Sequence, residues 1–196
     1  MKKQYLILLI ITIILCYISA MTAIYMAENL KNERENAKIN AEELLVKAEK
    51  TSNIKENTKV IEDFPNFPVI GKLYIEKINL EIAIISEFSY EGLKISICRY
   101  SGPVNIGEKG NLIITGHNYK NGSHFGELSK LEEDDLIKIV DVWGKEFLYK
   151  VYEVKRILPD DIRSLNEYKG TESLMLLTCL ENANSRLLVR CEKVII

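Results

Sequence analysis

The first part of the chain separates from the rest by its hydrophobicity. Lys2 and Lys3 precede an uncharged and mostly apolar run over residues 4–27. About 20 apolar residues form a helix long enough to cross the hydrocarbon core of a bilayer, so this run predicts a transmembrane helix. A cleaved signal peptide is the alternative, and its apolar region would be only about 7–15 residues long and end at a small-x-small site. Ile18-Ser19-Ala20 has a bulky residue at the first of those positions, which favours an uncleaved anchor over residues 1–27.

A polar segment follows the apolar run. Glu28–Asn57 is dense in Glu, Lys, Asn and Ala, and its few apolar residues recur close to helical spacing. This pattern indicates either a solvated helix or a charged flexible stalk. We assign residues 28–63 as a spacer without chemistry. Because paired N-terminal lysines favour a cytoplasmic N-terminus, the spacer and everything after it are expected on the extracytoplasmic side.

Residues 64–196 form the third part, where short apolar runs alternate with turn residues. The two prolines of Phe64–Pro68 break any helix and open this domain. Helical turns are expected near residues 90–95, 125–131 and 162–170. About seven or eight short strands with little helix indicate a closed or sandwiched all-β architecture. The predicted strands are Val69–Ile75, Leu80–Ile85, Asn111–Thr115, Leu136–Val142, Glu146–Val154, Leu174–Thr178 and Arg186–Ile195.

The charge balance and the spacing of Cys and His residues argue against nucleic-acid binding and against a structural zinc site. The formal net charge is -2, from 26 basic and 28 acidic residues, which argues against a nucleic-acid-binding protein. The two histidines and four cysteines include no C-x-x-C pair and no His spacing typical of a zinc ligand set. A structural zinc site is therefore not expected.

Two strand ends carry groups that can do chemistry. Cys179 closes the apolar run Leu174–Thr178, and His117 follows the strand Asn111–Thr115 after one glycine. A thiol can act as a nucleophile, and an imidazole can give a proton to a leaving amine and take one back. The plainer alternatives are a buried structural cysteine and a polar loop histidine. His124, deeper in the same loop, is assigned no role.

A guanidinium completes a possible cysteine acyl-transfer site. Arg186 opens the strand that follows Cys179, and a permanent positive charge there can stabilise an oxyanion. Arg190 is the rival, because positions 186 and 190 of one strand point to the same face. Arg186 lies nearer the loop, where a site would be, and is preferred for that reason.

The ordered set of these residues resembles the sortase family, the membrane-anchored cysteine transpeptidases of Gram-positive bacteria. The set consists of Thr115-Gly116-His117, then Thr178-Cys179, then Arg186 followed by three apolar residues, and the resemblance covers about residues 67–196. It implies a closed eight-stranded β-barrel. It also implies roles: Cys179 as nucleophile, His117 as general acid/base, Arg186 as oxyanion or substrate-orienting group, and Thr178 as a substrate-binding residue lining the groove.

The resemblance further implies the reaction. The cysteine would cleave a C-terminal sorting signal of surface proteins, similar to Leu-Pro-x-Thr-Gly, between Thr and Gly. The thioacyl intermediate would be resolved by an amine of the cell wall precursor lipid II or by a pilin lysine. The short segment between Val154 and Leu174 does not suit class B, and Asp63-Phe64-Pro65 has the residues of a pilin-type lid in another order. Class A or D is therefore expected.

Three further points stay open from the sequence. Some family members bind calcium, but residues 132–135 are typical of a solvated acidic turn, so neither a metal nor a cofactor is expected. Cys98 and Cys191 are either a disulfide or two buried thiols, and the second is preferred. The alternatives for function are a pilin-polymerising sortase, an anchored cysteine protease that releases its product to water, and a non-catalytic wall-binding module in which Cys179 is structural.

Overall fold

The computed structural model describes residues 2–52, 67–180 and 184–194. The chain divides into two compact units, Met1–Asn36 and Ala37–Ile196, and each is described by itself. The residues considered for a lid, Asp63-Phe64-Pro65, lie outside the described residues.

Helix α1 is continuous from Lys2 to Ser52. Its segment Ile10–Asn32 has a mean hydropathy of 2.1 and is long and apolar enough to cross a membrane. Large apolar side chains on it, such as Ile14 and Ile18, are exposed, and they make the kind of surface that lipid would cover. The segment overlaps the anchor predicted at residues 4–27. Of the two alternatives for the polar segment, the structure has the helix, as far as Ser52.

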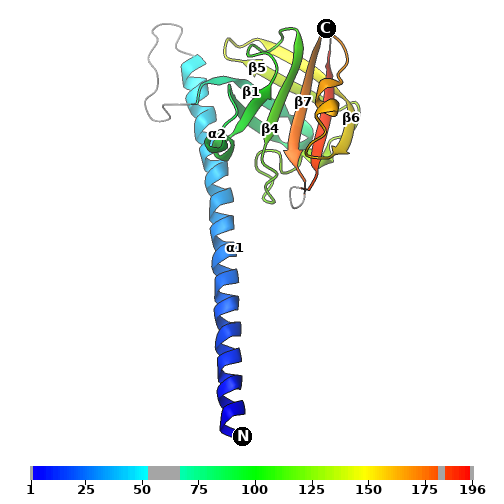
Figure 1. The fold of residues 1–196 in the computed structure, drawn as a ribbon. Helices are drawn as coiled ribbons and strands as arrows, with labels where there is room; N and C mark the ends of the chain where they lie inside the picture. The colour runs from blue at the N-terminus through cyan, green and yellow to red at the C-terminus, as the bar shows by residue number, and fades with distance from the viewer. Residues whose placement is uncertain (1, 53–66, 181–183, 195–196) are drawn as a thin grey trace. The chain divides into compact units, whose positions relative to one another are not determined.

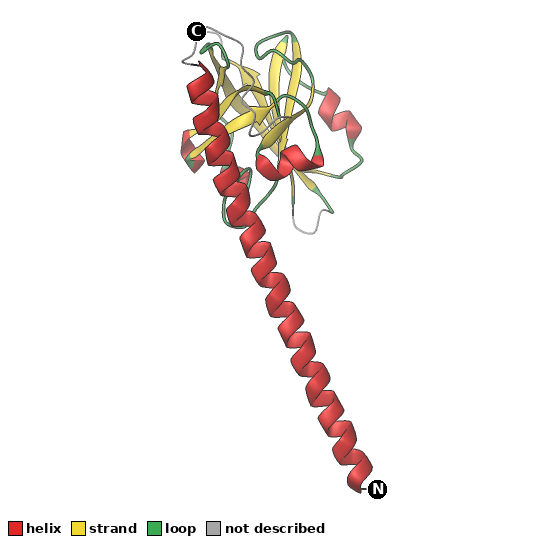
Figure 2. Cartoon of the chain, turned by 90° about the vertical axis from the view of Figure 1, so that its left-hand side faces the viewer, coloured by secondary structure: helices red, strands yellow, loops and turns green. Residues whose placement is uncertain are grey.

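The described residues of the second unit from 67 onward form a closed barrel of eight strands in the order β1-β2-β3-β4-β7-β8-β6-β5. This confirms the predicted all-β class with its closed eight-stranded barrel. Figure 2 shows that the part of the chain after α1 consists mostly of strands and loops, with a few short helices. The elements are β1 (Val69–Ile75), η1 (Glu76–Ile78), β2 (Leu80–Ile85), α2 (Tyr90–Ile95), β3 (Ile97–Ser101), β4 (Gly110–Gly116), η2 (Leu128–Lys130), β5 (Leu136–Asp141), β6 (Glu146–Ile157), α3 (Ile162–Asn166), β7 (Glu172–Cys179) and β8 (Arg186–Lys193).

The wall formed by β4, β7 and β8 is the part of the barrel that matters for chemistry. Strands β4 and β7 are parallel, in a register that runs from Gly110 opposite Glu172 to Gly116 opposite Thr178. Strands β7 and β8 are antiparallel, with Cys179 opposite Arg186. The last residues of β4 and β7 and the first residue of β8 therefore meet at one end of the barrel.

Side chains along this wall alternate between the barrel interior and its outer surface. Leu112, Leu174 and Val189 belong to the large buried core inside the barrel. Ile113, Met175 and Leu188 instead join a second buried cluster, which is covered by Leu165 of α3. Because successive residues of a strand point to opposite faces, the second set defines the outer face of the wall. Residues His117, Cys179 and Arg186 fall on this outer face by the same alternation.

Most strands match the sequence prediction within a few residues, but β3 was not predicted. Ile97–Ser101 follows α2 directly, and its parallel pairing with β2 covers only Ile84 to Ile97 and Ile85 to Cys98. Its antiparallel pairing with β4 shifts register between Arg99 and Ser101. Such a short strand is specified by neighbours far away in the sequence rather than by a pattern of its own. Strand β6 also runs on to Ile157, beyond the predicted end at Val154.

Candidate active site

Cys179 and Arg186 are in direct contact across the β7–β8 pair. An Nη1–H of Arg186 donates a hydrogen bond to the Cys179 sulfur over 2.7 Å. Both residues are partly exposed. Next to this pair, the Leu180 amide donates a hydrogen bond to the Ser185 carbonyl at 2.9 Å. The structure thus places two of the three predicted catalytic residues together.

Arg190 lies on the same outer face but is engaged elsewhere. It is only 6% exposed, and its Nη1 donates to Glu153 on β6 over 2.7 Å. Its Nη2 donates to the Ser164 carbonyl in α3 over 2.5 Å and lies 3.4 Å from a carboxylate oxygen of Glu167. Arg190 therefore holds α3 and its following segment against the barrel. These contacts separate the two arginines, which strand alternation could not do.

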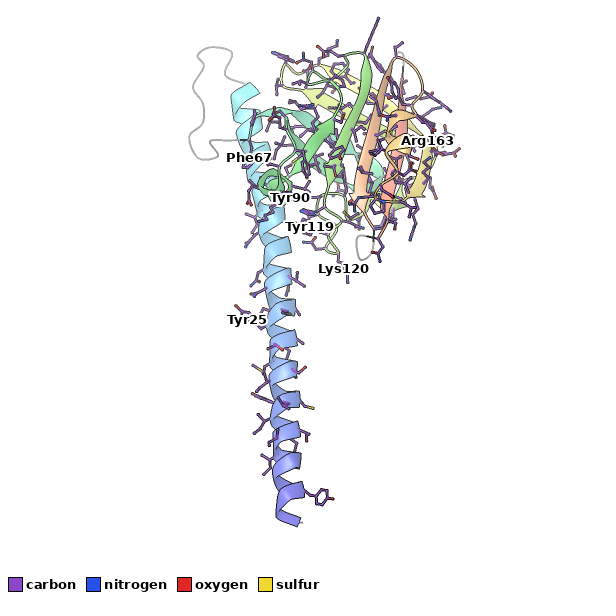
Figure 3. The ribbon with its side chains drawn as sticks, viewed as in Figure 1. Tyr25, Phe67, Tyr90, Tyr119, Lys120 and Arg163 are labelled. Carbon is purple, nitrogen blue, oxygen red and sulfur yellow. The ribbon has the colours of Figure 1, made fainter. Side chains whose placement is uncertain are left out.

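His117 is the first residue after β4 and is partly exposed. Since Gly116 pairs with Thr178 in the parallel register, His117 leaves β4 at the level at which Cys179 ends β7. The His117 carbonyl accepts a hydrogen bond from the Phe125 amide at 2.9 Å, which closes the loop that follows. Tyr119 and Lys120, labelled in Figure 3, mark this loop at the end of the barrel.

Two aromatic rings from the same loop accompany the His117 imidazole. The Tyr119 ring centroid is 5.0 Å from that of His117, and the His124 ring is stacked at 6.4 Å. Tyr119 and His124 also meet each other edge to face at 5.1 Å. His124 is 1% exposed and has a φ of +52°, which is uncommon for a residue with a side chain. The sequence assigned His124 no role, whereas the fold places it beside His117.

Thr178 faces away from the surface that carries Cys179. It is 1% exposed, and its hydroxyl donates to the Gly116 carbonyl over 2.7 Å. The bond joins the end of β7 to the end of β4, next to the two chemistry-bearing residues. A substrate contact by Thr178 stays a prediction from the family resemblance.

Asn118 is a residue of this site that the sequence interpretation missed. Its side-chain amide donates to the Cys179 carbonyl over 2.9 Å. No spacing rule marks an asparagine after a histidine as special, because the partner lies 61 positions further along the chain. Only the parallel pairing of β4 and β7 brings the two together.

The remaining thiols of the barrel are buried on opposite sides of its wall. Cys98 packs with Ala83 and Ile85 in a cluster outside the barrel, whereas Cys191 belongs to the core inside it. Both are free thiols with 0% exposure, so the disulfide alternative is wrong. Burial raises the pKa of the Cys98 thiol to about 11 and also raises that of Cys191. Neither thiol is suited to act as a nucleophile.

One lysine pairs with two of the four carboxylates of the acidic turn at residues 132–135. The Lys77 ammonium lies 2.7 Å from a Glu132 carboxylate oxygen and 2.9 Å from one of Asp135. These hydrogen bonds to Glu132 and Asp135 raise the pKa of Lys77. Among the described residues, no group of three or more His, Cys, Asp or Glu side chains is arranged to hold a metal ion.

Comparison with known proteins agrees with this geometry. A sequence model of the family described as Sortase domain matches residues 73–194. Sortase D of Bacillus subtilis (strain 168) is 28% identical over 109 residues, which cover 56% of this chain and 53% of that protein. The chain thus spans about half the length of this curated relative.

Solved structures of the same kind share the fold. Sortase A from Corynebacterium diphtheriae is 27% identical with a TM-score of 0.60, over 67% of this chain and 63% of that one. Sortase C1 from Streptococcus agalactiae is also 27% identical with a TM-score of 0.60, over 71% of this chain and 74% of that one. Because the family match extends over more than half of the chain and contains the ends of β4 and β7 and the start of β8, this protein belongs to the sortase family.

Proposed function

We propose that this protein is a membrane-anchored cysteine transpeptidase that cleaves a sorting signal similar to Leu-Pro-x-Thr-Gly between Thr and Gly. The observation that carries the proposal is the 2.7 Å contact between Arg186 Nη1 and the Cys179 sulfur. It joins a partly exposed thiol to a permanent cation on the surface where His117 also leaves its strand. The other thiols of the barrel are buried.

In the first half of the reaction, the Cys179 thiolate attacks the carbonyl carbon of the signal's threonine. The carbonyl oxygen takes up the negative charge, and Arg186 donates to it; a guanidinium has five N–H donors and can serve the sulfur and the oxyanion together. The C–N bond then breaks, and protonated His117 gives its proton to the leaving glycine nitrogen. The products are a thioester on Cys179 and a free peptide amine.

In the second half, an incoming primary amine attacks the thioester carbon. Neutral His117 takes a proton from this amine, the C–S bond breaks, and the thiolate returns to its contact with Arg186. The product is a new amide bond. We propose that the acceptor is an amine of the cell wall precursor lipid II, and that the donor is a surface protein bearing the signal.

The N-terminal helix supports the proposed location. A helix with an apolar span at Ile10–Asn32 and two lysines before it suits a single-pass anchor with a cytoplasmic N-terminus. The barrel would then lie on the extracytoplasmic side, where its donors and acceptors are. Protease treatment of intact cells should digest the barrel; a barrel protected until the membrane is opened would contradict this orientation.

The reaction is tested with the full chain in detergent micelles and a fluorescent sorting-signal peptide, with and without triglycine. We expect an acyl adduct on Cys179 in mass spectra and an amide product that appears only with the amine. Cys179→Ala should lose both. Wild-type protein without any adduct on Cys179 would overturn the cysteine mechanism.

The choice of acceptor amine distinguishes the proposed function from the pilin-polymerising enzyme and the cysteine protease. A pilin-polymerising enzyme forms the same thioester but would prefer a peptide with an internal lysine to triglycine. A cysteine protease would release the cleaved peptide equally fast with and without either amine. Parallel reactions with triglycine, a lysine peptide and no amine therefore assign the second half of the reaction.

A further inference from the structure

The ends of β4 and β7 are joined by two side-chain hydrogen bonds that run in opposite directions. Thr178, just before Cys179, donates its hydroxyl to the carbonyl of Gly116, just before His117. Asn118, just after His117, donates its amide to the carbonyl of Cys179 itself. Both chain neighbours of His117 are therefore hydrogen-bonded to the end of β7: Gly116 to Thr178, and Asn118 to Cys179.

The second of these bonds lies where the strand ladder has stopped. The parallel register of β4 and β7 ends at Gly116 opposite Thr178. Beyond this point the β4–β7 ladder gives no pair for His117, the first residue after β4, or for Cys179, the last residue of β7, which pairs with Arg186 on the other side. The Asn118 amide spans the two segments at this level over 2.9 Å. It adds a side-chain link between the two segments just beyond their last backbone pair.

The loop fixes Asn118 from its other side. Asn118 and His124 form an isolated antiparallel bridge, and the Phe125 amide donates to the His117 carbonyl at 2.9 Å. The rings of Tyr119 and His124 pack against each other beside the His117 imidazole. These contacts fix the backbone at Asn118. The short Asn118 side chain links this fixed backbone to β7.

We propose that Asn118 is a positioning residue that holds the His117 segment in register with Cys179 for the transfer of the proton to the leaving amine. The proposal rests on the proposed function, in which His117 is the general acid. Asn118 would act through His117 and would not touch the reacting atoms. A general acid must lie within hydrogen-bond reach of the leaving nitrogen, and a displacement of about 1 Å can cost ~100-fold in rate.

The test compares two substrates that differ only in the leaving group. One is the sorting-signal peptide with its Thr–Gly amide, and the other is the same peptide with a thioester at that bond. A thiolate leaves without needing a proton, so the thioester does not depend on His117 as an acid. In Asn118→Ala, measured as full chain in micelles, we expect kcat for the amide to fall ~10–100-fold with little change in KM. Because the second half of the reaction also uses His117, the two substrates are compared in the first turnover, which ends at the thioester on Cys179. There the amide should be cleaved more slowly than by the wild type, and the thiol leaving group should be released from the thioester at nearly the wild-type rate.

Two further measurements separate positioning from loosening of the fold. Alkylation of Cys179 by a small neutral haloacetamide should proceed at nearly the wild-type rate, because the Arg186 contact comes from β8 and is untouched. Asn121→Ala is the matched control, since Asn121 accepts from the amide and hydroxyl of Ser123 within the same loop. It should leave kcat for the amide close to wild type.

Each contrary outcome overturns the inference. These outcomes are an unchanged kcat for the amide in Asn118→Ala, an equal loss for amide and thioester, and an equal loss in Asn121→Ala. All of them leave the cysteine mechanism standing as long as the wild type forms its adduct on Cys179. Absence of that adduct in the wild type would instead remove the proposed function.

Discussion

Arg186 and Arg190 point to the same face of β8, yet one donates to the Cys179 sulfur and the other is buried against Glu153 and α3. The two positions are equivalent on the strand, but the residues around each arginine give it different hydrogen-bond partners. Arg186, at the end of the barrel, is partly exposed. At position 190 the outer face is covered by the segment after β6, which needs a cation to satisfy its carbonyl and carboxylate groups.

The two arginines should therefore separate activity from stability. Arg186→Ala should lower kcat/KM for the sorting-signal peptide by ~100- to 1,000-fold, because an oxyanion donor is lost, with little change in unfolding. Arg190→Met should reduce the free energy of unfolding by ~2–3 kcal/mol, at or below the ~3–5 kcal/mol typical of a broken buried ion pair, because Glu153 is partly exposed and can rehydrate. Peptide cleavage and urea denaturation measure the two effects. A larger loss of activity in a folded Arg190→Met would reverse the assignment.

Thr178 offers a choice between a substrate contact and a link between strands. Thr178→Val keeps the shape but removes the hydroxyl that donates to the Gly116 carbonyl. Leaving that buried acceptor unpaired should cost ~1–3 kcal/mol of unfolding free energy, and Thr178→Ser should restore most of it. Denaturation and Michaelis kinetics on both variants distinguish the roles. A raised KM in Thr178→Val at unchanged stability would favour the substrate contact.

The barrel thiols should differ sharply in reactivity. At about pH 8, a neutral haloacetamide should modify Cys179 and leave Cys98 and Cys191 unmodified until the protein is unfolded. The pKa of Cys98 is raised to about 11, so this thiol stays protonated below that pH and would form thiolate only as the pH rises through it. Peptide mapping by mass spectrometry reads each site separately. Modification of Cys98 in the folded protein would contradict its burial.

Gly116 directly precedes His117 in the chain, and its surroundings leave no room for a side chain. A Cβ there would lie 2.7 Å from Ile97 Cγ2 and 2.8 Å from Phe125 Cδ2, both in the core. Gly116→Ala should therefore cost ~1–3 kcal/mol through overpacking and should lower activity by displacing His117. Calorimetric melting and peptide cleavage measure these effects.

Gly144 supplies the control for this change. It has a φ of +82° and no atom within 4 Å of an added Cβ, so Gly144→Ala tests backbone strain alone. That strain should cost about 1 kcal/mol, without an effect on cleavage. If Gly116→Ala melted no lower than the wild type, the close packing around Gly116 would be disproved.

The sequence by itself determined the features that are local in the chain. The apolar run before residue 28, the strands bounded by turn residues and the all-β class all follow from short-range patterns that solvent and backbone geometry impose. The residues able to do chemistry were also visible, because Cys179, His117 and Arg186 stand at strand ends. Strand β3 was not predicted, since its short pairings depend on β2 and β4 rather than on a pattern of its own.

The tertiary structure decided everything that depends on pairing between distant segments. Register between β7 and β8 set Arg186 against the sulfur, and the cover of α3 buried Arg190. The parallel register of β4 and β7 turned Thr178 inward and brought Asn118 to the Cys179 carbonyl. The reason is physical: alternation along a strand gives only the face of a side chain, whereas its partner is chosen by the closure of the barrel and by what covers that face.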